Sequence, residues 1–132
     1  MADLPPNFEV PSPRRGRPLR PTIVSFAGWV LVIAGALTTI GGFLFLAVGS
    51  SEGTSLGLGL AAFGVAELAT GIEVLRMVAA FRTIGVVVAS VGAVIDVVGL
   101  ISGSRWQVVA LVLHVAALIA LSSQREAFVG PG

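Results

Sequence analysis

Long apolar stretches separated by short polar segments make up most of the chain. The first stretch, residues 22–48, contains no charged residue, and three more follow at about 54–76, 81–101 and 105–122. A helix needs about 20 such residues to cross the hydrocarbon core of a bilayer. The stretches are nearly continuous rather than alternating, and an open sheet edge in lipid would leave backbone groups unpaired, which excludes strands. The pattern therefore predicts an all-α integral membrane bundle of four antiparallel transmembrane helices, the last of them short.

The composition supports lipid rather than water as the solvent around these segments. Of the 132 residues, 55% are hydrophobic and 11% are charged, whereas soluble domains average roughly a quarter charged residues. The chain has no cysteine, which excludes disulfides, thiol catalysis and cysteine-ligated metals. A net charge of +1 gives no indication of nucleic-acid binding. All eight basic residues are arginine, which together with abundant alanine, valine and glycine indicates a bacterial genome rich in G and C.

The two ends of the chain differ from the apolar middle. Residues 1–21 hold six of the seven prolines and no apolar face that could support folding. We predict a disordered, Pro/Arg-rich cytoplasmic tail at 1–21, a transmembrane domain at 22–122 and a second cytoplasmic tail at 123–132. The basic residues of the first tail could bind anionic lipid headgroups, belong to a proline-rich ligand for a cytoplasmic partner, or only orient the first helix. These residues are Arg14, Arg15, Arg17 and Arg20.

The arginines are distributed unevenly between the two sides of the predicted bundle. Seven lie in the two tails or in the connection that holds Arg76 and Arg82, and only Arg105 lies on the opposite side. Cytoplasmic segments of membrane proteins carry an excess of Lys and Arg. We therefore predict a multi-pass protein of the bacterial inner (plasma) membrane with both termini in the cytoplasm.

Glycines recur every seven residues in the first three apolar stretches. A strict seven-residue repeat keeps one side of a helix facing a partner, and in lipid small residues allow helix backbones to approach closely. We predict that these glycine faces meet in the bundle interior or at a subunit contact, and that Ala110 and Ala117 continue the pattern in the fourth stretch. The glycines are Gly28, Gly35, Gly42, Gly57, Gly64, Gly71, Gly85, Gly92 and Gly99.

Three ionisable residues, Glu67, Asp96 and His114, lie inside apolar stretches. A charge at bilayer depth costs at least ~2.5 kcal/mol, so each one invites a functional hypothesis. From the helical rise, Glu67 and His114 both lie roughly 12–15 Å from the cytoplasmic helix ends, and Asp96 lies roughly 22 Å away. Glu67 and His114 could form an interhelical hydrogen bond that sets helix order, or a proton-responsive pair or relay. Asp96 could bond Thr39, lie near Arg105, or form a cation or proton entry site.

No catalytic constellation appears in the sequence. It lacks the zinc-protease and P-loop patterns. A single histidine, with Glu67 and Asp96 at different depths, predicts no metal site. The one candidate nucleophile for an intramembrane hydrolase is Ser90, beside His114. We predict a protein that is not an enzyme and that binds no metal or cofactor.

Several short segments resemble small four-span membrane proteins of actinobacteria. Arg20-Pro21-Thr22-Ile23-Val24, followed by Trp29, resembles the start of their first helix. Leu75-Arg76 and Ala80-Phe81-Arg82-Thr83 are similar to their basic turn between spans two and three. Leu121-Ser122-Ser123-Gln124-Arg125-Glu126-Ala127-Phe128 is similar to their closing tail. The resemblance implies the topology and the host, and it adds no activity.

Two classes of function fit these observations. The favoured one is a non-catalytic membrane protein with a structural or interaction role, as a homo-oligomer or an accessory subunit of a larger membrane complex. It rests on the glycine faces, which exceed what one four-helix monomer needs. The alternative is a small proton- or cation-coupled transporter or channel subunit that uses Glu67, Asp96 and His114. In both classes the expected partners are the lipid bilayer and other membrane chains, and not nucleic acid.

Overall fold

The computed structural model describes residues 21–49, 51–124 and 128, and this part of the chain is all-α. The predictions for the basic residues of the first tail, and for most of the second tail, fall outside the described residues. No strand occurs in the described part. The four helices are α1 (Thr22–Val48), α2 (Ser51–Leu75), α3 (Ala79–Ile101) and α4 (Gln107–Ser123). The predicted fold class is therefore confirmed.

Three of the four helices, α1, α2 and α3, are long and apolar enough to cross a membrane. The fourth, α4, is also apolar but has only 17 residues. Large hydrophobic side chains cover the outside of the helices: Leu37 is 65% exposed, Phe43 60% and Leu44 64%. A continuous apolar surface of this kind is unfavourable in water and is typical of proteins that contact lipid.

The first hairpin consists of α1 and α2, which pack through paired glycines. A Cβ atom on Gly35 would lie 2.6 Å from the carbonyl oxygen of Gly64, and Gly42 faces Gly57 in the same way at 2.7 Å. A third pair, Gly28 and Gly71, follows seven residues further along each helix. Only hydrogen atoms fit between the two backbones at these positions, so the six glycines permit the close approach of α1 and α2.

The second hairpin consists of α3 and α4, and its glycines have a different role. A Cβ atom on Gly85 would meet the side chain of Leu121, and one on Gly99 would meet that of Gln107. Gly92, midway between them, faces the ring of His114. Each glycine of α3 therefore makes room for a larger side chain of α4, and no pairing of glycines occurs here.

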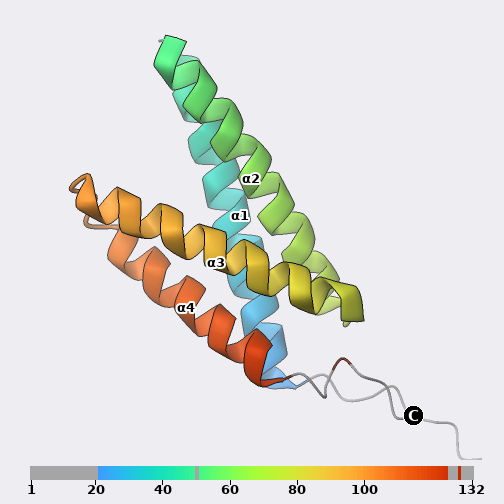
Figure 1. Cartoon of the computed structure of the whole chain (residues 1–132). Coiled ribbons are helices and arrows are strands. Elements are labelled where there is room, and N and C mark those ends of the chain that lie inside the picture. Colours follow the sequence, from blue (N-terminus) through green and yellow to red (C-terminus); the bar gives the residue numbers. More distant parts are fainter. Residues whose placement is uncertain (1–20, 50, 125–127, 129–132) are drawn as a thin grey trace, which may run out of the picture.

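The two hairpins meet at one end and diverge at the other (Figure 1). We call the end where α1 begins and α4 finishes the terminal end, and the opposite end the turn end. The buried apolar core lies toward the terminal end and includes Val24, Leu31, Val74, Ala117 and Leu121. Toward the turn end, the α1–α2 hairpin and the α3–α4 hairpin separate in Figure 1.

Two helices begin a few residues away from the predicted positions. Gly49 ends α1 with a left-handed backbone (φ 76°), which glycine adopts without a Cβ clash. The polar segment 49–53 separates the first two predicted stretches, but α2 already begins at Ser51. In the third connection, Gly103 takes φ 93°, and α4 begins at Gln107 rather than at 105. Composition marks the polar segments correctly. The helix α2 nevertheless extends into the first of them, where its backbone groups gain hydrogen bonds, whereas α4 begins two residues later than predicted.

Candidate functional site

Glu67, Asp96 and His114 form one buried hydrogen-bonded network, with one residue each from α2, α3 and α4. The Nε2 atom of His114 lies 2.6 Å from Oε1 of Glu67, and its Nδ1 atom lies 2.7 Å from Oδ2 of Asp96. Glu67 is 0% exposed, His114 4% and Asp96 5%. The network therefore joins the α1–α2 hairpin to the α3–α4 hairpin between the core and the region where the hairpins diverge.

The network requires two bridging protons. A neutral imidazole carries only one N–H, so it can donate to one carboxylate but not to two. Both short contacts become hydrogen bonds if His114 is an imidazolium, or if one of the carboxyl groups is protonated. Either arrangement has a net charge of −1. Loss of one proton changes the net charge from −1 to −2. It also leaves the lone pair of a ring nitrogen facing a carboxylate oxygen.

Glu67 has an unused hydrogen-bonding atom. Its Oε2 is buried and has no partner among the described residues. Thr70, one turn along α2 and 3% exposed, donates its hydroxyl to the carbonyl oxygen of Ala66. A buried carboxylate oxygen without a donor is unfavourable. Among the described residues, Glu67 is therefore held in the network through Oε1 alone.

The residues around His114 explain why it reaches both acids. A Cβ atom at position 92 would lie 2.5 Å from Nε2 of His114, so only glycine leaves room for the ring against α3. Glu67 and His114 were expected at the same depth, and the structure brings them together. No titratable residue occurs in α1, so α2, α3 and α4 supply every ionisable group of the network.

The predicted bond between Asp96 and Thr39 is wrong. We expected a bond to Thr39 or proximity to Arg105, because the helical rise placed Asp96 farther from the cytoplasmic ends than His114. In the structure Asp96 pairs with His114, whereas the hydroxyl of Thr39 donates to the carbonyl oxygen of Gly35. Cβ atoms tilt toward the N-terminus of their own helix. The side chains of Asp96 and His114, on antiparallel helices, therefore lean toward each other and close the difference in depth.

The candidate for an intramembrane hydrolase does not have the geometry of a nucleophile and its base. The hydroxyl of Ser90 is exposed and donates to the carbonyl oxygen of Val86 in its own helix, while His114 is buried. Within the described part of the chain, no group of three acidic or histidine side chains is arranged to hold a metal ion. The polar atoms of the network are instead directed at one another.

Sequence reasoning missed the role of Arg82. This residue was used only to orient the bundle, but its Nε atom donates to the carbonyl oxygen of Leu121 at 2.9 Å. Its terminal nitrogen also donates to the carbonyl oxygen of Ser122 at 3.1 Å. These are end carbonyls of α4, which lack partners within the helix. The sequence shows an arginine near the start of the third apolar stretch. Only the structure shows that this arginine reaches the end of α4.

Comparison with models of known protein families, with curated proteins and with solved structures finds no match to this chain. The buried network is therefore interpreted from its own geometry and chemistry.

Gly92→Ala is expected to disrupt the buried network with a minimal change in size. The added methyl group occupies the position of the His114 ring, so the ring must move away from Glu67, Asp96 or both. His114 is the only histidine, so nitrogen NMR of protein labelled in histidine reports this one ring. We expect both ring nitrogens to be hydrogen-bonded in the native chain and at least one to lose its partner in Gly92→Ala. The neighbouring lipid-facing variant Val91→Ala should keep the native spectrum.

Proposed function

We propose that this chain is a non-catalytic, four-span membrane protein whose two hairpins change their packing with the protonation of the Glu67–His114–Asp96 network. It would act as a proton-responsive accessory subunit of a membrane assembly. The observation that carries the proposal is the bonding of both ring nitrogens of His114 to two separate buried carboxyl groups. This arrangement holds the hairpins together only while it contains two bridging protons.

The direction of the response follows from the charges around the network. Raising the pH removes a bridging proton, which breaks one hydrogen bond and increases the buried negative charge. Arg82 does not offset this charge, because it bonds the end carbonyls of α4 at Leu121 and Ser122. We therefore expect the contact between the hairpins to be tight at low pH and loose at high pH. Histidine is the side chain whose ordinary titration falls in the physiological range.

The proposed location is the inner membrane of a bacterium, with both ends in the cytoplasm. The distribution of the arginines and the resemblance to actinobacterial four-span proteins support this location. The glycines no longer support a homo-oligomer, because all nine predicted positions make contacts within one chain. Another subunit would have to contact the exposed apolar faces of the helices instead.

A distance measurement across the two hairpins tests the proposal. The chain has no cysteine, so spin labels can be attached at Leu58→Cys on α2 and Ile101→Cys on α3, which are 58% and 82% exposed in the native chain. We expect the distance between the labels to increase as the pH rises from about 5 to about 9, a range that brackets the ordinary histidine titration.

The matched control replaces the whole network by leucines (Glu67→Leu, Asp96→Leu and His114→Leu), and its label distance should not depend on pH. A native label distance that stays constant over this range would refute the proposal. The alternative function, a proton- or cation-coupled transporter or channel subunit, uses the same three residues and additionally requires a pH-dependent flux across liposomes.

A further inference from the structure

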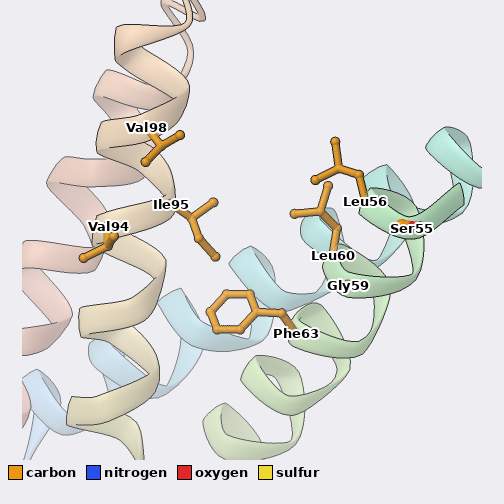
Figure 2. A pocket seen from close by; sticks show the side chains of 8 residues that line it. All are labelled: Ser55, Leu56, Gly59, Leu60, Phe63, Val94, Ile95 and Val98. Carbon is orange, nitrogen blue, oxygen red and sulfur yellow. The ribbon is translucent and has the colours of Figure 1, made fainter. Parts of the chain in front are cut away.

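An apolar groove opens between the two hairpins at the turn end. It has a volume of about 390 Å³ and lies between α2 and α3, where Figure 1 shows the hairpins separating. In Figure 2 the side chains of Leu60 and Phe63 extend from α2 toward that of Ile95 on α3. The lining, which we call the hairpin groove, consists of Ser55, Leu56, Gly59, Leu60, Phe63, Val94, Ile95 and Val98.

The groove lining indicates the chemistry of the occupant. Ser55 is the only residue of the lining with a polar side chain, so a polar ligand would lose its hydrogen bonds to water without replacement. The volume lies at the lower end of the roughly 300–1,000 Å³ that is usual for ligand sites. The apolar lining therefore favours a hydrocarbon chain.

A transmembrane helix fits the groove less well. Helices associate in lipid where small residues let their backbones approach, as the glycines of α1 and α2 do. Small residues, Ser55 and Gly59, occur only on the α2 wall of the groove, whereas every lining residue of α3 is branched (Val94, Ile95 and Val98). A flexible acyl chain adapts to such an uneven surface, whereas a rigid helix would contact only the tips of the side chains.

The turn end also provides a charge for a lipid headgroup. Ser55 lies near the start of α2, about 6 Å along the helix from Ser51. The connection between α3 and α4 follows the α3 wall of the groove and contains Arg105 and Trp106, both exposed, the first of them seven residues after Val98. Arginine binds phosphate, and tryptophan is enriched at the level of lipid headgroups. A phospholipid with its phosphate at this level would direct an acyl chain along the groove toward Phe63.

We infer that the hairpin groove binds one acyl chain of a phospholipid whose phosphate contacts Arg105. The lining contains none of the three residues of the buried network, so this inference stands or falls separately from the proton-responsive function. The bound chain fills the space where the hairpins diverge. It is therefore held longer than the lipids that cover the outer faces of the helices.

Tryptophan quenching by brominated phosphatidylglycerol tests the inference. The groove reporter carries Phe63→Trp, with Trp29→Phe and Trp106→Phe to remove the native signals. The control keeps Trp29, which is 56% exposed on α1, and carries only Trp106→Phe. Both proteins are loaded in vesicles of the brominated lipid and diluted into mild detergent. We expect the groove reporter to stay quenched severalfold longer than the control.

Two variants locate the bound lipid. Gly59→Leu places a side chain in the groove, where a Cβ atom meets nothing within 4 Å, so the protein should fold and the prolonged quenching should disappear. Arg105→Gln should shorten the retention severalfold by removing the phosphate contact. The inference would be overturned if the groove reporter and the Trp29 control lost their quenching at the same rate. It would also be overturned if Gly59→Leu left the prolonged quenching of the groove reporter unchanged. A groove tryptophan that the lipid never quenches would likewise overturn it, and would indicate a second copy or a partner helix in the groove.

Discussion

Gly35→Leu is expected to separate α1 from α2 and to produce a large loss of stability. A Cβ atom at this position would lie 2.6 Å from the carbonyl oxygen of Gly64 and closer still to the amide nitrogen of Leu68. Both are backbone atoms of a helix, so they cannot move aside as a side chain would. Overpacking of a core usually costs about 1–3 kcal/mol, and we expect a loss at or above the upper end of that range.

The matched control for this prediction is Gly41→Leu on the same helix. A Cβ atom on Gly41 meets nothing within 4 Å, and leucine has a higher helix propensity than glycine. The stability of both variants is measured by unfolding in mixed micelles that contain an increasing fraction of denaturing detergent. Gly41→Leu should unfold at or above the native midpoint, and Gly35→Leu well below it. Similar midpoints for the two variants would show that the close approach of α1 and α2 is not needed for stability.

His114→Ala is expected to destabilise the contact between the hairpins by about 3–5 kcal/mol. The substitution removes the only partner that bonds both acids, and leaves Glu67 and Asp96 buried without it. Most of the loss comes from these uncompensated groups rather than from the missing ring. The same detergent unfolding experiment measures the change.

Replacing all three residues of the network should cost less stability than replacing His114 alone. In the triple leucine variant no carboxyl group remains to be desolvated, and replacement of a buried ionic cluster by apolar residues is often neutral or stabilising. We therefore expect the triple variant to be more stable than His114→Ala, although it contains two more substitutions. This non-additivity is the sign of groups that act as a unit. A triple variant less stable than the single one would contradict that interpretation.

Much of the helical framework follows from the order of residues alone. The ends of α1 coincide with the predicted apolar stretch at 22–48, because the bilayer length and the flanking polar residues define that helix locally. The seven-residue spacing of the glycines likewise marks the contact faces without knowledge of the partner. The spacing does not show that Gly35 meets Gly64, or that the glycines of α3 face larger side chains instead.

The buried network could be predicted only in part. Each of its three residues attracts attention alone, because ionisable groups are unfavourable in lipid. A depth estimate paired Glu67 with His114 but separated Asp96 from both, since it treats helices as parallel rods with side chains perpendicular to their axes. The tilt of the Cβ atoms on antiparallel α3 and α4 removes that separation.

The sequence by itself determined the class of this protein: apolar helices for lipid, glycine faces for helix packing and three ionisable residues at depth. Only the tertiary structure decided which helices pair, that Asp96 joins Glu67 and His114, and that a groove opens between the hairpins. The physical reason is that lipid and protein interior are equally apolar. Leu60 in the groove and Leu58 on the outer surface therefore look alike in the sequence, and the angle between the two hairpins distinguishes them.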